Sequence, residues 1–122
     1  MAFGISRNVP ASASWQALLA HGEQMRGRHL AELFAGDPQR FERLTRESGP
    51  LVLDLSKQRI EEDTLQHLME VAREQDLDGW IARLFGGEHV NCSEGRAAMH
   101  WALRLPADAD CRVDDVDVVK QV

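Results

Sequence analysis

Apolar residues recur at intervals of three and four along four stretches of the chain, the spacing of one face of an α-helix. Gly36 follows the second stretch and Gly86-Gly87 follows the fourth, as expected where helices end. Glu61-Glu62-Asp63 places negative charge at the start of the third. The pattern therefore predicts four amphipathic helices, each needing a partner surface. Their apolar positions are Trp15, Leu18, Leu19 and Gly22; Leu30, Leu33 and Phe34; Leu65, Leu68, Met69 and Ala72; and Leu77, Trp80, Ile81, Leu84 and Phe85.

A strand-like pattern separates the second and third helices. Leu51, Leu53 and Leu55 alternate with Val52 and Asp54, directly after the turn signal Ser48-Gly49-Pro50. We expect a small antiparallel hairpin here, with a short helix over residues 39–46 as the alternative for the preceding segment.

The two ends of the chain carry weaker signals. Residues 1–13 are small and polar and predict a flexible arm, after which Ser14 is a suitable cap for the first helix. Near the C-terminus, Cys111, Val113 and Val116 fit a short edge strand, and a helix is expected from about Asp117.

The stretch GGEHVNCSEGRAAMHWALR, residues 86–104, predicts one more helix. Asn91 and Ser93 are good N-caps, and Glu94 lies where the first turn favours negative charge. The expected fold class is therefore mostly α with a small β-hairpin. The apolar face of this last helix would consist of Ala97, Ala98, Trp101, Ala102 and Leu105.

Composition and charge narrow the class of protein. The net charge of −6 is uneven: residues 1–60 hold eight Lys/Arg against six Asp/Glu, about +2, and residues 61–122 hold six against fourteen, about −8. This acidic second half argues against binding to nucleic acid or an anionic membrane, which needs clustered positive charge. Two cysteines without an export signal are typical of reduced thiols, so we expect a cytoplasmic location.

The same stretch 86–104 also concentrates residues that could carry chemistry. A zinc site could use His89 and Cys92 with His100 and Cys111 as further ligands. Structural zinc is held by two closely spaced ligand pairs, and only His89-x-x-Cys92 has such a spacing. Two thiols and two hydrogen-bonded histidines without a metal are the better interpretation.

Catalytic interpretations of this stretch are equally weak. Cys92 and His100 on one helix would be eight residues and about 12 Å apart, too far for a nucleophile and its base. Nothing fixes the separation of Glu88 and Glu94, as paired carboxylates would require. Two further histidines, His21 and His67, lie among polar helix positions and are expected to be exposed.

The stretch nevertheless resembles a known family. It matches the pattern G-E-x-I-N-x-T-E-x-R-A-x-L-H-x-A-L-R of glucose-6-phosphate isomerases, and Val90, Ser93 and Met99 are conservative departures. Upstream, the chain is similar to the family's segment L-x-x-D-x-S-K-x-x-[IV]-x-x-x-T-L-x-x-L, and the matching positions are Asp54, Ser56, Lys57, Thr64 and Leu65. The resemblance covers residues 14–105, and 111–122 loosely. The identical positions of the main stretch are Gly87, Glu88, Asn91, Glu94, Arg96, Ala97, His100, Ala102, Leu103 and Arg104.

Two departures from the family pattern are local. Leu55 stands where the family's D-Y-S-K segment has tyrosine, and LPADADC after Arg104 replaces the usual N-R. They put local contacts in doubt rather than family membership.

The resemblance implies an enzyme that interconverts glucose 6-phosphate and fructose 6-phosphate by ring opening and proton transfer through an enediol, without metal or cofactor. Members are dimers several times longer than this chain, built of two α/β sandwich domains with N-terminal helices packed against them. Their catalytic glutamate, histidine, arginine and lysine and their phosphate loop match positions beyond Val122. Residues 14–122 are therefore expected to be the N-terminal segment, truncated before the sugar-phosphate-binding domains and without catalytic, cofactor or metal residues of its own.

Two interpretations of the chain's role follow. The first is a structural, dimer-supporting segment whose partners are the remainder of the isomerase chain and a second subunit. The alternative is a stand-alone helical interaction module derived from that family. Under the first, Arg96 and His100, neighbours at i and i+4 on the expected helix, could together meet a phosphate or carbonyl, and their matching positions suggest a buried polar pairing that anchors this helix to the rest of the enzyme.

Overall fold

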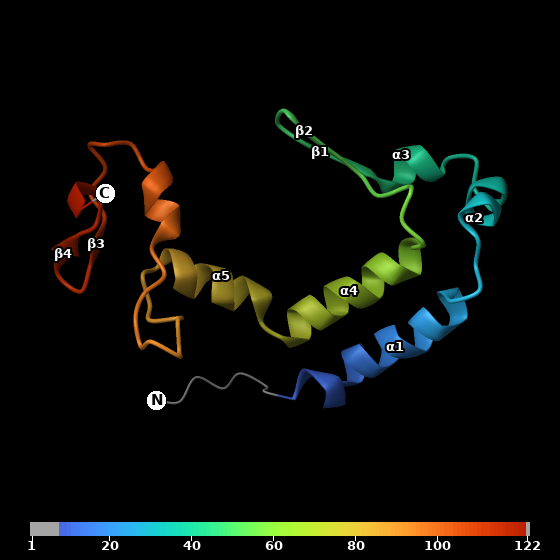
Figure 1. Ribbon diagram of the computed structural model, residues 1–122, viewed down its shortest axis with the longest axis horizontal. Helices are drawn as coiled ribbons and strands as arrows, with labels where there is room; N and C mark the ends of the chain where they lie inside the picture. Colours follow the sequence, from blue (N-terminus) through green and yellow to red (C-terminus); the bar gives the residue numbers. More distant parts are fainter. Residues whose placement is uncertain (1–7, 122) are drawn as a thin grey trace. The chain divides into compact units, whose positions relative to one another are not determined.

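The computed structural model describes residues 8–121, which divide into two compact units at Gln75-Asp76. Helices make up most of the first unit, and a β-hairpin interrupts them (Figure 1). Its elements are the 3₁₀ turn η1 (Val9–Ala11), the helices α1 (Ala13–Met25), α2 (Leu30–Gly36), α3 (Arg40–Leu44) and α4 (Glu62–Glu74), and the strands β1 (Thr45–Ser48) and β2 (Leu51–Asp54).

Helix α1 begins two residues earlier than expected, because its cap is Ser12 and not Ser14. The Ser12 side chain accepts a hydrogen bond from the Trp15 amide at 3.3 Å. The Ser14 amide instead donates to Glu74 Oε2 at 3.0 Å, which ties the start of α1 to the end of α4. Of the arm expected over residues 1–13, the part up to residue 7 lies outside the described residues, and Val9–Ala11 form a 3₁₀ turn.

The prediction that His21 is exposed was wrong. Its side chain is buried between α1 and α4, and Nε2 lies 2.6 Å from Thr64 Oγ1. The Thr64 oxygen also accepts the Glu61 amide at 3.0 Å, so a single hydroxyl both caps α4 and holds α1. The His67 ring, half-buried, packs 5.2 Å from that of His21. A polar contact thus selects the buried face of α1.

This contact leaves much of the predicted apolar stripes open. Leu19 and Gly22 on α1 are exposed, and so are Leu68 and Met69 on α4. Helix α1 packs on the face of α4 that carries Thr64 and His67. The neighbouring face of α4, which carries Leu68 and Met69, is therefore exposed.

The hairpin expected between α2 and α4 is confirmed, and the helix considered over residues 39–46 forms but is shorter, because Thr45 and Arg46 belong to β1. Residues Arg40–Leu44 form the short helix α3, and β1 and β2 pair antiparallel from Thr45↔Asp54 to Ser48↔Leu51. Gly49, at φ +55°, makes the tight turn between them.

In the second unit, α5 (Leu77–Phe85) is where the pattern placed it and ends at Gly86. The continuous helix expected from residue 93 to 105 was wrong. Gly95 adopts φ +63°, outside helical conformation, and the Asn91 amide donates to Arg96 O at 3.2 Å to close a turn. Helical structure is confined to the 3₁₀ segment η2 (His100–Arg104), where Trp101 Nε1 donates to Leu84 O at 3.2 Å.

The C-terminal region forms a hairpin rather than the expected single edge strand. Strands β3 (Arg112–Val113) and β4 (Val116–Asp117) pair antiparallel, and the 3₁₀ turn η3 (Val119–Gln121) replaces the helix expected from about Asp117. Val113 lies against Gly87, where a Cβ atom would meet its Cγ2 at 2.5 Å, so a side chain at position 87 would push this hairpin away.

Candidate functional site

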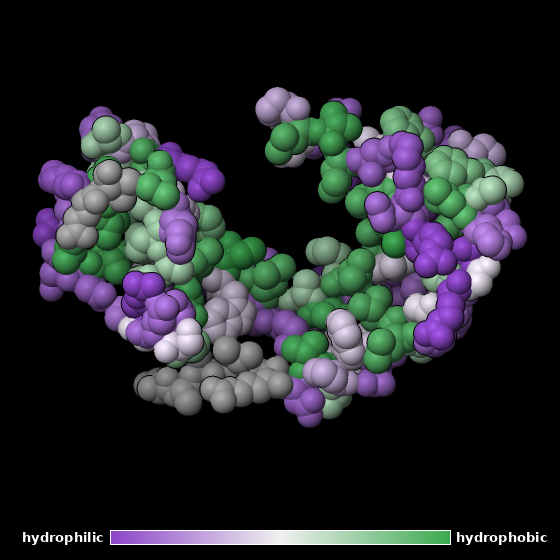
Figure 2. All heavy atoms as spheres, in the orientation of Figure 1, coloured by the Kyte–Doolittle hydropathy of each residue, from purple (hydrophilic) through white to green (hydrophobic). Residues whose placement is uncertain are grey.

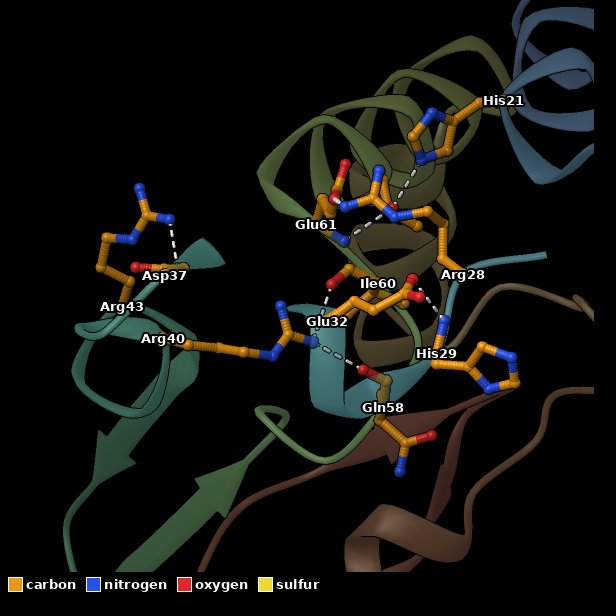
Figure 3. Close-up of polar contacts among 11 residues, drawn as sticks. His21, Arg28, His29, Glu32, Asp37, Arg40, Arg43, Gln58, Ile60 and Glu61 are labelled. Carbon is orange, nitrogen blue, oxygen red and sulfur yellow. Dashed lines mark hydrogen bonds and ion pairs between the residues drawn. The ribbon is translucent and has the colours of Figure 1, made fainter. Parts of the chain in front are cut away.

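A charged cavity of about 300 Å³ lies in the first unit, between α2, α3 and the start of α4. Figure 3 shows several of its lining side chains, with Arg40 reaching towards the loop after β2 and Arg43 beside Asp37. The charged groups that line it are Arg28, Glu32, Asp37, Arg40, Arg43, Glu61, Glu62 and Asp63.

Arg40 is the best-buried charge at this site, with 2% of its surface exposed. Among residues 8–121 its guanidinium has no carboxylate partner, and it donates to three backbone carbonyls. Nε donates to Ser56 O at 2.8 Å. Nη2 donates to Gln58 O at 2.7 Å and to Ile60 O at 2.8 Å (Figure 3). The planar fork suits this task, because one flat group can reach several carbonyls of a loop at once. Arg40 therefore fixes the loop that connects β2 to α4.

The other cations of the cavity are paired within it. Arg28 Nη2 lies 3.1 Å from Glu61 Oε1. Arg43 forms a hydrogen-bonded ion pair with Asp37, which raises the pKa of the arginine above its usual value. Glu32 accepts the His29 amide at 3.2 Å and so caps α2. No nucleophile faces this cavity among residues 8–121, and its paired charges tie helices together rather than present a general base.

The motif Asp54-x-Ser56-Lys57 forms a turn at the start of the loop that connects β2 to α4. The Asp54 carboxylate pairs with Lys57 and accepts the Ser56 hydroxyl at 2.5 Å and the Ser56 amide at 2.8 Å. These contacts, Lys57 first and then the Ser56 hydroxyl and amide, lower the Asp54 pKa to about 2. The resemblance covers these residues but implies no role for them. An Asp two residues before a Ser is the sequence signal for such a turn.

The candidate residues of the stretch 86–104 do not assemble into a catalytic group. His89 Nε2 lies 2.8 Å from Asp114 Oδ2, and both side chains are exposed. Cys92 is exposed with its thiol 3.5 Å from Val90 O, and Cys111 is half-buried. Within residues 8–121, no three His, Cys, Asp or Glu side chains are close enough to hold a metal ion.

Cys92 and His100 do not lie on one continuous helix, so the predicted separation of about 12 Å along a helix axis does not apply to them. The predicted pairing of Arg96 with His100 changes for the same reason. Arg96 is exposed and forms an ion pair with Glu94, and His100 is exposed. Both still line one shallow pocket of about 340 Å³ beside Met99. Glu88 is exposed.

Comparison with known proteins identifies the family. The sequence model described as phosphoglucose isomerase matches residues 54–122, more than half of the chain. The chain belongs to the phosphoglucose isomerase family. It is 48% identical over 118 residues to glucose-6-phosphate isomerase 1 of Rhodococcus jostii, covering 97% of this chain and 22% of the relative. Glucose-6-phosphate isomerase 2 of Chromohalobacter salexigens is 49% identical over 117 residues, covering 96% of this chain and 21% of that protein.

The chain thus spans about a fifth of the length of the curated relatives it matches, and it corresponds to their N-terminal part. The resemblance found in the sequence is confirmed, and so is a mostly helical fold with a small antiparallel hairpin. In the part of the chain that the structure describes, no helix is long and apolar enough to cross a membrane.

Arg40→Lys tests the carbonyl clamp. A single ammonium cannot reproduce the three-carbonyl geometry and leaves buried carbonyls without donors, so we expect a loss of about 1–3 kcal/mol in the free energy of unfolding. Urea denaturation measures it. Arg43→Lys, at an exposed pair next to the same cavity, is the matched control and should change stability far less. Equal losses in the two variants would contradict the clamp.

The Asp54 carboxylate should titrate near pH 2, well below the ordinary value of about 3.9. Because the folded pKa is depressed, the stabilisation is present above the ordinary pKa and is lost as pH falls towards 2. Carboxyl-detected NMR titration measures the midpoint, which Ser56→Ala should raise. The destabilisation caused by Asp54→Asn should also shrink as the pH falls through 2. A midpoint near 4 in the parent would refute these contacts.

Proposed function

We propose that the full-length protein is an aldose–ketose isomerase that interconverts glucose 6-phosphate and fructose 6-phosphate through an enediol, in glycolysis and gluconeogenesis. The observation that carries this proposal is the dense match of residues 87–104 within a chain 48% identical to a named glucose-6-phosphate isomerase. The full-length protein works in the cytoplasm as a homodimer and needs no cofactor, metal, nucleic acid or membrane.

Within this enzyme, residues 1–122 are structural. The three arginines that line the charged cavity are used in the Arg40 clamp and in ion pairs. The reactive side chains of the stretch 86–104 are exposed singly or in surface pairs. An isomerase of this kind needs a base held against the carbon-bound proton and groups that bind phosphate. That machinery belongs to the part of the protein beyond residue 122.

The alternative is a stand-alone helical interaction module. Such a module should cover its own apolar side chains, because exposed apolar patches promote association. Several large apolar side chains remain open in the first unit, among them Leu51, Val52 and Met69 at 71%, 65% and 53% exposure. This exposure favours a segment that the rest of a larger protein covers.

The isolated 122-residue chain should not convert fructose 6-phosphate to glucose 6-phosphate, whereas the full-length protein should. A coupled assay that follows glucose 6-phosphate formation measures both preparations under the same conditions. Turnover by the pure chain would show that it contains catalytic residues. Absence of turnover from the folded full-length protein would refute the proposed reaction.

A further inference from the structure

Helix α1 is held to α4 by few apolar side chains. The two helices run side by side in the first unit (Figure 1), and the buried residues of α1 are His21 and Met25. Figure 2 shows apolar side chains on the surface of this unit, and Leu68 and Met69 of α4 are among the exposed ones. The docking of α1 on α4 therefore depends strongly on the polar contact that His21 makes.

The geometry of this contact assigns a protonation state to His21. A hydroxyl group has one hydrogen to donate and can accept two hydrogen bonds. Thr64 Oγ1 accepts the Glu61 amide at 3.0 Å, and among residues 8–121 the structure gives its hydrogen one acceptor, His21 Nε2 at 2.6 Å (Figure 3). Because Nε2 accepts, it carries no proton, and the docked imidazole ring is neutral with its hydrogen on Nδ1.

Protonation of His21 would break this hydrogen bond. With hydrogens on both ring nitrogens, Nε2 could no longer accept, and its N–H would meet the hydroxyl hydrogen of Thr64. The His21 side chain is buried, so water does not replace the lost partner while α1 stays docked. A buried donor without an acceptor favours release of α1, since water can then satisfy both groups.

A second histidine opposes a positive charge on His21. The ring of His67, on α4, lies 5.2 Å from that of His21. Within residues 8–121, His67 Nδ1 has no hydrogen-bond partner, and Glu70 Oε2, 3.5 Å away, would pair with His67 once it is charged. That pair lies within α4, so it persists when α1 leaves and does not hold α1. A charged His67 would instead repel a charged His21 across the helix contact.

The other charged groups around the contact keep their charge over the range in which imidazole groups titrate. Hydrogen bonds from the Ser14 hydroxyl and amide lower the pKa of Glu74 below its ordinary value, so this carboxylate stays ionised at mildly acidic pH. Carboxylates and guanidinium groups ordinarily do so as well. Beside the contact lie the ion pairs Arg28–Glu61 and, on α1 itself, Arg26–Glu23.

We propose that His21 and His67 form a pH-sensitive switch, which docks α1 on α4 at neutral pH and releases it as the pH falls through about 6. The docked helix binds fewer protons than the released one, so acid shifts the equilibrium towards release. One imidazole that titrates with the ordinary value of about 6.5 only after release makes release about tenfold more favourable at pH 5.5 than at pH 7.5. The switch goes beyond the proposed reaction and does not depend on it.

Hydrogen exchange in the full-length protein tests the switch. The opening constant of α1, taken from amide exchange and corrected for the intrinsic effect of pH, should rise at least about threefold from pH 7.5 to pH 5.5. Helix α5, which contains no histidine, is the control within the same protein and should change less than about twofold. A smaller rise in α1, or an equal rise in α1 and α5, would overturn the proposal.

His21→Gln separates the switch from other titrations. Glutamine can offer Thr64 an acceptor oxygen but takes up no proton, so the pH response of α1 should fall below about twofold. His100→Gln, at an exposed histidine of the second unit, is the matched control and should keep the response of the parent. A response retained in His21→Gln or lost in His100→Gln would overturn the proposal. Should His21→Gln fail to fold, the comparison of α1 with α5 in the parent still decides.

Discussion

The buried guanidinium of Arg40 is the constraint on which the first unit depends. Its three donors hold the carbonyls of Ser56, Gln58 and Ile60, so α3, the loop after the hairpin and the start of α4 keep one arrangement. In the sequence, the β1–β2 hairpin lies between Arg40 and the three carbonyls to which it donates. Among residues 8–121 the buried apolar side chains are few, namely Met25, Leu33, Leu44 and Ala102. With so small an apolar core, polar contacts such as this clamp and the His21–Thr64 hydrogen bond decide how the elements sit.

The elements that could be predicted from the sequence are those whose own residues determine them. Helices α4 and α5 follow from apolar spacing, and the hairpin follows from its alternation and turn. The stretch 93–105 failed because Gly95 takes a left-handed conformation, which residue spacing does not reveal. The prediction of the buried face of α1 failed because the Thr64 hydroxyl on α4 determines which face is buried. Much of the apolar stripe that the pattern marks as core remains exposed.

The candidate site, too, could be predicted from the sequence only in part. The stretch 86–104 identified the family, yet its histidines, cysteines and carboxylates lie singly or in exposed pairs. Arg40 gave no signal, because an arginine in a polar segment is ordinarily a surface residue. Its role is visible only in the folded structure, where the loop from Ser56 to Ile60 surrounds its guanidinium. The residues of this chain for which the structure shows a role, above all Arg40, organise structure.

The central proposal is that residues 1–122 contribute structure and no chemistry to the full-length protein. Its most direct test is kcat for fructose 6-phosphate in the full-length protein carrying His89→Asn, Cys92→Ser, Glu94→Gln and His100→Asn together. The account predicts a kcat per folded molecule within about threefold of the parent, since loss of a general acid or base typically costs about 10²–10⁴-fold. A loss of that larger size, in a protein with an unchanged melting temperature, would place catalytic chemistry in this chain and contradict the account.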